Sequence, residues 1–151
     1  MADILATQGK DAECEFVLVR CVREHPRFVP AYNGLAELQM RHGRVSQAAK
    51  VLSWALRINP RDPVLLNNFG MCWLIQRDYE KALVYFTRAA EMAPRNARYQ
   101  ANVAVAQGLM GRYDDSLSSL TRVMPEDQAK HNLQVLREAG KDAGTGKVVT
   151  N

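Results

Sequence analysis

Residues 63–96 read PVLLNNFGMCWLIQRDYEKALVYFTRAAEMAPRN, and this stretch decides the fold because its pattern recurs before and after it. Three prolines close successive copies at a spacing of 34 residues: Pro26, Pro60 and Pro94. A bulky residue stands eight positions before each proline: Leu18, Leu52 and Phe86. Small residues stand twelve and five positions before it: Cys14, Ala48 and Ala82, then Cys21, Ala55 and Ala89. A fixed period of this length is typical of repeat proteins, in which each unit buries its apolar face against its neighbours.

Each repeat is predicted to fold as a first and a second helix that run antiparallel. Ala82, Phe86 and Ala89 recur at helical spacing and give the second helix one apolar face. Turn residues separate the paired helices, and the prolines separate the repeats because proline cannot continue a helix interior. The expected helices span 29–42 and 45–58, 63–76 and 79–92, 97–110 and 113–123, with a last helix over 126–138. At the start of the chain we expect a helix over 12–25, preceded only by a helical stub over 3–8.

The pattern resembles the tetratricopeptide repeat (TPR), W-x2-L-G-x2-Y…A-x3-F…P. Leu66-x2-Phe69-Gly70-x2-Trp73 matches its first half, and weaker copies begin at Tyr32 and Gln100. The resemblance implies an all-α, right-handed superhelical solenoid of antiparallel TPR helix pairs over residues 1–138. Its parts are a partial repeat (1–28), repeats 29–62, 63–96 and 97–126, and a C-terminal capping helix (126–138). Residues 139–151 are expected to form a flexible tail, since they are polar and rich in glycine.

Composition does not indicate enzyme chemistry. His25, His42 and His131 have no spacing typical of a catalytic triad or a metal site. The three cysteines also lack metal-ligand spacing, and we expect them to be small buried residues in a reducing compartment. The chain is therefore predicted not to be an enzyme, with no catalytic residues, no cofactor and no metal.

Charge and hydropathy limit the kinds of partner. The net charge is only +4 and no basic aromatic cluster is present, so nucleic-acid binding is not predicted. Direct membrane insertion is not expected either, because no apolar run approaches the ~20 residues of a membrane span. No secretory signal is visible, which predicts a cytoplasmic location, with a periplasmic or membrane-anchored location as the alternative if a signal has been removed. Arg27, Arg61 and Arg95 each follow a repeat proline and are expected to form a row. This row either is a solvated edge or attracts an acidic partner.

The TPR resemblance implies that the first helices line a concave groove that holds a peptide or a helix of another protein. Projected onto this sequence, the partner-binding groove comprises Asn33, Glu37, Met40, Arg41, Asn67, Asn68, Met71, Leu74, Arg98, Asn102, Val105, His131 and Asn132, with Ile75, Leu109 and Val135 beside them. Asn68, Asn102 and Asn132 occupy equivalent positions, here called a slot, in successive first helices. They are predicted either to form a ladder for a peptide backbone, similar to that of O-linked N-acetylglucosamine transferases, or to pack between repeats.

Two departures from familiar TPR patterns affect the choice of partner. Chaperone-binding TPR domains grip a C-terminal carboxylate with lysine, asparagine and arginine side chains, but Glu37 stands where the resemblance requires an asparagine and would repel that carboxylate. Trp54 occupies a slot that holds Arg20, Arg88 and Arg122 elsewhere. It is either a possible second interface or a ring folded over the neighbouring helix.

A narrower resemblance is to bacterial TPR proteins of pilus assembly and secretion, including the tight-adherence type, through Leu66–Gly70, the break at Val123–Glu126 and Asn132-Leu133. Three functions stay open at this point. The chain is a scaffold or adaptor for another protein, an assembly factor that forms a homo-oligomer through its incomplete N-terminal repeat, or a regulatory fragment of a larger enzyme.

Overall fold

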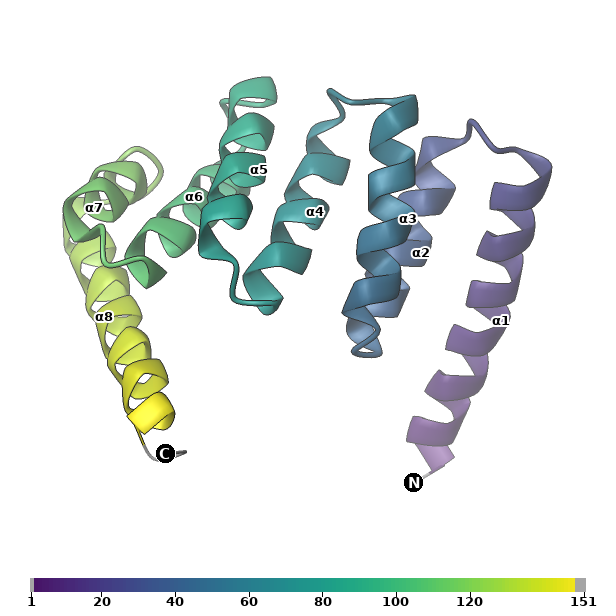
Figure 1. Cartoon of the computed structure of the whole chain (residues 1–151), viewed down its shortest axis with the longest axis horizontal. Helices are drawn as coiled ribbons and strands as arrows, with labels where there is room; N and C mark the ends of the chain where they lie inside the picture. The colour runs from purple at the N-terminus through teal and green to yellow at the C-terminus, as the bar shows by residue number, and fades with distance from the viewer. Residues whose placement is uncertain (1, 149–151) are drawn as a thin grey trace.

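Eight α-helices follow one another along the described part of the chain, with no strand among them. The computed structural model describes the backbone of residues 2–148 and the side chains of residues 7–141. The helices are α1 (Ala2–Glu24), α2 (Val29–Arg41), α3 (Val45–Ile58), α4 (Pro63–Ile75), α5 (Tyr79–Met92), α6 (Ala97–Leu109), α7 (Tyr113–Thr121) and α8 (Glu126–Val148). Each helix packs against the next, which gives an open array with α1 and α8 at its two ends (Figure 1). The predicted all-α solenoid is confirmed.

Side-chain caps define where three of the helices begin. The Asp62 carboxylate accepts hydrogen bonds from the backbone N–H groups of Val64 (2.9 Å) and Leu65 (3.2 Å), and Pro63 occupies the first turn of α4. Asn96 caps α6 in the same way, and Asp78 caps α5. Such caps satisfy backbone donors that have no partner inside the helix. The start of each of these helices is therefore encoded locally.

The apolar core is continuous across repeat boundaries. One buried cluster joins Tyr32 of α2 and Leu52 of α3 to Phe69 of α4. The next joins Leu66 of α4 and Phe86 of α5 to Val103 of α6. The repeated small and bulky residues of α3 and α5 are all fully buried: Ala48, Leu52, Ala55, Ala82, Phe86 and Ala89. Because each cluster spans two repeats, no repeat buries its apolar face alone.

The N-terminal end differs from the prediction, because α1 is one helix instead of a stub followed by a helix over 12–25. Asp11, in the expected break, contacts the end of α2, with 3.1 Å between its Oδ2 and His42 Nε2. Glu15 pairs with Arg44 one turn further on. Cys14 is exposed and Cys21 half-buried, which corrects the expectation that both are buried. The reason is that no other helix of the described residues precedes α1 to cover the face that carries them, whereas α2 covers the matching face of α3.

The C-terminal end also differs. The helix expected to end at residue 138 continues as α8 to Val148, so residues 139–148 of the predicted flexible tail are helical. Glycines weaken a helix by about 1 kcal/mol each, but they keep the backbone N–H that proline lacks, and no proline follows Pro125. Residues 149–151 of the predicted tail, and Met1, lie outside the described residues. Within the described part of the chain, no helix combines the length and apolar character required to cross a membrane.

Candidate partner-binding groove

The first helices form the inner face of the array. The first helix α2 contacts α4, and α6 contacts α8, whereas no two second helices of the described chain pack together to that extent. A layer whose helices lie closer together is the inside of a curve. Helices α2, α4, α6 and α8 therefore form one layer of the array, and the groove expected along this layer stays a prediction.

Two adjacent asparagines of α4 join this helix to its neighbours on the concave side. Asn68 donates hydrogen bonds from Nδ2 to Oδ1 of Asn33 and, at 3.2 Å, to Oε1 of Glu37, both on α2. Asn67 accepts a hydrogen bond at 2.7 Å from Nδ2 of Asn102 on α6. Asn67 and Asn68 are both buried. Side-chain amides thus connect three consecutive first helices.

These contacts bear on the two alternatives for the asparagine slot. In Asn68 and Asn102 the amide donors point to the preceding first helix, which is the geometry of packing between repeats. Asn132 is oriented differently, because its Nδ2 donates to Sδ of Met124 in the turn before α8. The three residues therefore do not form one uniform row of free amides.

Glu37 takes the acceptor position beside Asn68. Its Oε1 receives hydrogen bonds from Nδ2 of Asn33 and Nδ2 of Asn68, each at 3.2 Å. The Glu37 side chain is exposed. A partner's carboxylate placed here would meet a negative charge that already uses these amide donors, in agreement with the exclusion of a chaperone-type clamp.

Four apolar residues of the predicted groove are half-buried and form what we call its floor. Met40, Met71, Leu74 and Val105 all fall in this class. Sγ of Cys72 lies 3.5 Å from Sδ of Met40, so the floor reaches the core beneath it. Burial raises the pKa of the Cys72 thiol to about 11, which keeps it protonated at neutral pH and unsuited to act as a nucleophile.

The charged residues predicted for the groove are exposed, but they are not equally available. Arg41 points to α1, with Nη1 3.5 Å from Oδ1 of Asp11. Arg98 on α6 and His131 on α8 are exposed. Within the described residues, no cluster of histidine, cysteine, aspartate and glutamate has the arrangement of a metal site.

Large apolar side chains are exposed along the same helices. Ile75 on α4 and Val135 on α8 are 49% and 52% exposed. Val64, which the sequence prediction missed, is 41% exposed in the first turn of α4. It occupies the slot of Arg98 in the next repeat, so the period itself contained the signal that would have found it.

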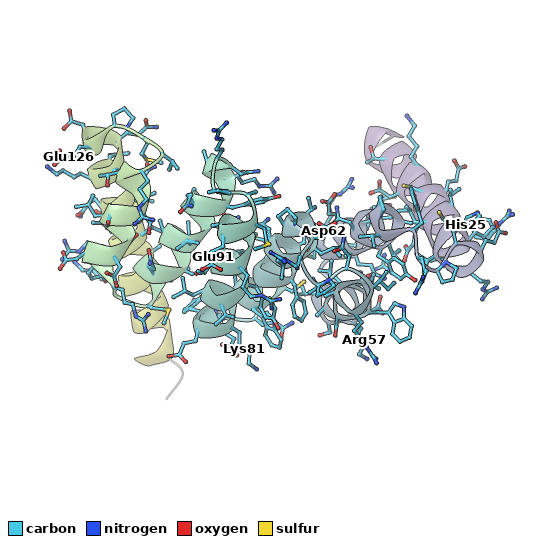
Figure 2. The ribbon with its side chains drawn as sticks, turned by 90° about the horizontal axis from the view of Figure 1, so that it is seen from above. His25, Arg57, Asp62, Lys81, Glu91 and Glu126 are labelled. Carbon is cyan, nitrogen blue, oxygen red and sulfur yellow. The ribbon has the colours of Figure 1, made fainter. Side chains whose placement is uncertain are left out.

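Trp54 lies on a second helix, outside the groove. It is 55% exposed on α3, with the Arg57 guanidinium 5.4 Å from the centre of its ring. In Figure 2, Arg57 and Lys81, from the consecutive second helices α3 and α5, point outward along one edge of the array. The ring is therefore available on the surface opposite the first helices.

Comparison with known proteins agrees with this architecture. A family model described as a tetratricopeptide repeat matches residues 33–97. The protein YrrB, whose crystal structure is described as that of a TPR protein with an unusual peptide-binding site, superimposes with a TM-score of 0.72 at 18% identity, over 93% of this chain and 74% of that one. The described residues thus have the fold of a TPR solenoid, and residues 33–97 match the tetratricopeptide repeat itself.

Among curated proteins, anaphase-promoting complex subunit 3 of Schizosaccharomyces pombe is 27% identical over 117 residues, which is 76% of this chain. Human superkiller complex protein 3 is 28% identical over 89 residues, or 59% of this chain. The chain spans 18% of the first relative's length and 6% of the second's.

Proposed function

We propose that the chain is a non-catalytic scaffold that binds a peptide or a helix of another protein on the concave face of its first helices. The observation that carries the proposal is the exposure of Val64, Ile75 and Val135 on that face, beside a half-buried floor of methionine and leucine. Exposed apolar area costs roughly 25 cal/mol per Å² relative to burial, so a partner that covers these side chains is favoured. The structural neighbour YrrB, described as having an unusual peptide-binding site, supports peptide binding by this fold.

The contacts between the first helices also indicate how a partner would be held. Asn68 and Asn102 use amide donors between helices, which leaves less capacity to pair with a peptide backbone. Recognition then depends on side chains, with apolar anchors over Ile75 and Met71 and polar contacts to Glu37 and Arg98. An amphipathic helix or an apolar peptide satisfies these requirements.

Affinity capture tests the proposal with a matched pair of variants. Ile75→Asp places a charge in the groove, and Val84→Asp places the same charge on α5 at a side chain that is 54% exposed outside the groove. In extract from the organism that encodes the chain, partners should be retained by the wild type and Val84→Asp and lost with Ile75→Asp. Equal capture by all three proteins would contradict a groove-based function.

Self-association is the second candidate, favoured by the apolar surface of α1. Phe16, Val17 and Val19 are 65%, 62% and 43% exposed. Helix α1 lies at the end of the array, and among the described helices it packs mainly on α2. A second copy laid on α1 would bury these side chains in a symmetric contact. Val17→Glu should then convert a dimer to a monomer in analytical ultracentrifugation, and a wild type that is monomeric at high concentration would exclude this candidate.

We propose the biological system from the sequence. A role in bacterial pilus assembly or secretion rests on the short sequence resemblances described above, as does a periplasmic or membrane-anchored location in place of a cytoplasmic one. A regulatory segment of a larger enzyme is a further alternative. Fractionation of the native cells, followed by identification of the captured partner, separates these possibilities.

A further inference from the structure

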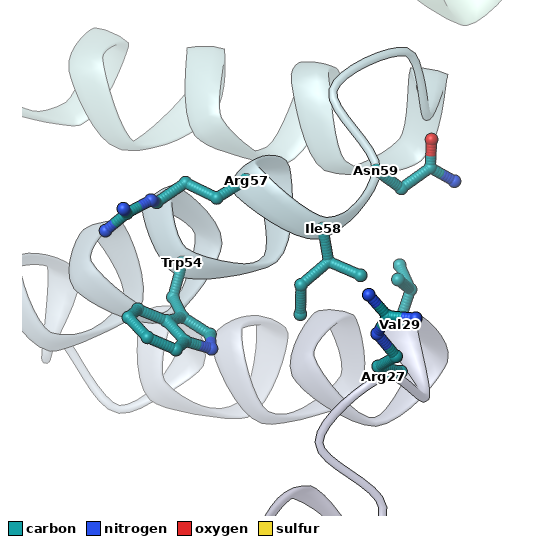
Figure 3. A pocket seen from close by; sticks show the side chains of 6 residues that line it. All are labelled: Arg27, Val29, Trp54, Arg57, Ile58 and Asn59. Carbon is teal, nitrogen blue, oxygen red and sulfur yellow. The ribbon is translucent and has the colours of Figure 1, made fainter.

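A second surface lies around Trp54, on the side of the array formed by the second helices. A surface cavity of about 590 Å³ opens between the end of α3 and the turn that joins α1 to α2. Its lining consists of Arg27, Val29, Trp54, Arg57, Ile58 and Asn59 (Figure 3). Two of these residues are cations and none is an acid, so the cavity has a net positive charge.

The lining combines an apolar floor with a charge at each end. Ile58 lies between Trp54 and Arg27, Val29 lies beside Arg27, and Arg57 extends past the other side of the indole (Figure 3). A second cavity of about 350 Å³ adjoins Trp54 and Arg57 and includes Lys50. Neither cavity has an acidic residue in its lining.

The repeat pattern explains why the cavity occurs at this position. In the next repeat Arg88 stands in the slot of Trp54, and its Nη2 donates a hydrogen bond at 3.3 Å to the carbonyl oxygen of Pro60. That contact links the second helix to the preceding inter-repeat turn. Trp54 makes no such link, and the matching carbonyl of Pro26 accepts from the Tyr32 hydroxyl at 2.6 Å. The space between α3 and the turn therefore stays open.

The charge at this position is also specific to one repeat. In the next repeat, Arg61 and Arg88 occupy the positions equivalent to Arg27 and Trp54, and Glu91 occupies the position equivalent to Arg57. The repeat of Trp54 therefore has an arginine where the next repeat has an acidic residue. Neither Arg27 nor Arg57 forms an ion pair with any described residue. Two unpaired guanidinium groups flank an apolar floor and an exposed indole.

We propose that this cavity binds an acidic segment of a partner protein, with carboxylates at Arg27 and Arg57 and an apolar side chain between them against Trp54 and Ile58. Arginine pairs with carboxylates through charge-assisted hydrogen bonds, and an exposed tryptophan provides a rigid apolar contact. The charge of the lining selects acidic chains, and its apolar floor distinguishes a peptide from a simple anion. This surface is separate from the concave groove, so the chain can hold two partners at once.

Nuclear magnetic resonance of the indole N–H groups tests the proposal directly. The chain has two tryptophans, and Trp54→Phe identifies which resonance belongs to Trp54. The probe is the peptide acetyl-Asp-Glu-Leu-Asp-Glu-amide, and the controls are its uncharged counterpart acetyl-Asn-Gln-Leu-Asn-Gln-amide and inorganic phosphate. We expect the acidic peptide to move the Trp54 resonance in a saturable way and to leave the Trp73 resonance in place.

The variants make the result specific. Arg57→Glu introduces the residue of the next repeat, and with Arg27→Gln it should weaken peptide binding by about tenfold or more. Arg95→Gln, an exposed arginine at another inter-repeat turn, should leave binding unchanged. Equal shifts from the acidic and uncharged peptides, equal shifts from phosphate, no shift at millimolar peptide, or undiminished binding to the Arg27→Gln/Arg57→Glu protein would each overturn the proposal.

Discussion

Gly70 and Phe86 fit together only because Gly70 has no side chain. A β-carbon at Gly70 would lie 2.6 Å from Cδ1 and 2.7 Å from Cε1 of the Phe86 ring, closer than carbon atoms pack. The same two slots hold alanine and leucine in the flanking repeats: Ala36 with Leu52, and Ala104 with Leu120. Across the three repeats, the larger residue on the second helix is matched by the smaller one on the first.

This relationship predicts a strong coupling between the two positions. Gly70→Ala alone should lower the free energy of unfolding by about 1–3 kcal/mol through overpacking. Combined with Phe86→Leu, which copies the flanking repeats, it should cost less than the sum of the two single changes. Urea denaturation of the four proteins of this cycle measures the coupling, and additive losses would show that the contact does not constrain the pair.

Arg77 is predicted to be a point of backbone strain. It has a φ of 65°, while Gly43 and Gly111 occupy the same turn slot with φ values of 75° and 80°. A residue with a β-carbon is disfavoured there by roughly 1–2 kcal/mol. Arg77→Gly should therefore raise stability by about 1 kcal/mol after allowance for the greater freedom of glycine in the unfolded chain. Arg77→Ala retains the β-carbon and should give no such gain; thermal unfolding that stabilises both variants equally would contradict the explanation.

Gln39 and Gln107 share a slot but should respond oppositely to the same change. Oε1 of Gln39 is buried without a hydrogen-bond partner among the described residues, whereas Oε1 of Gln107 accepts from the Ser119 hydroxyl at 2.8 Å. The slot of Ser119 holds Val51 in the repeat of Gln39. Gln39→Leu should raise the free energy of unfolding by about 1 kcal/mol, and Gln107→Leu should lower it by a similar amount. Chemical denaturation that gives the same sign for both would refute this assignment.

The contact between α1 and the turn after α2 should depend on pH. Arg44 donates hydrogen bonds to both oxygens of the Glu15 carboxylate, at 2.7 and 2.8 Å, and these bonds lower the pKa of Glu15 below its usual range. A carboxyl group with a depressed pKa stabilises the folded state above its unfolded pKa of about 4.3, and this stabilisation is lost as the pH falls through the folded pKa.

Arg44→Gln should therefore be less stable than the wild type at neutral pH and equal to it in acid. Arg112 occupies the same slot two repeats later and forms no ion pair with a described residue, so Arg112→Gln is the matched control. Thermal unfolding across the pH range measures both. A wild-type advantage that persists unchanged in acid would show that Glu15 is not its source.

The repeated part of the fold could be predicted from the sequence because the periodic residues are the ones that the helices bury against each other. Ala48, Leu52 and Ala55, and their counterparts in α5, are buried as the period requires. The period also places Cys14, Leu18 and Cys21 on α1, but it does not show where the two end helices begin and finish. Asp11, at the expected break in α1, makes nonlocal contacts with Arg41 and His42 that the period does not indicate.

The sequence period identifies which residues of the candidate groove occupy equivalent positions, but it does not identify which side chains they contact. The period indicates that Asn68 and Asn102 are equivalent, and it does not indicate that their amides point to the preceding helix. The cavity beside Trp54 arises because a tryptophan replaces the arginine that bridges to the turn in the next repeat. The tryptophan at this position is visible in the sequence, but the cavity could not be predicted without the three-dimensional position of Arg27.

Site-specific photocrosslinking tests the central claim most directly. A photoreactive amino acid is placed at position 75 in the groove and, in a separate protein, at position 84 on α5, where the exposed fractions of Ile75 and Val84 are similar at 49% and 54%. Irradiation in the native cells should give a discrete crosslinked partner from position 75 and none from position 84. A partner crosslinked from position 84 but not from position 75 would contradict the assignment of the concave groove as the binding surface.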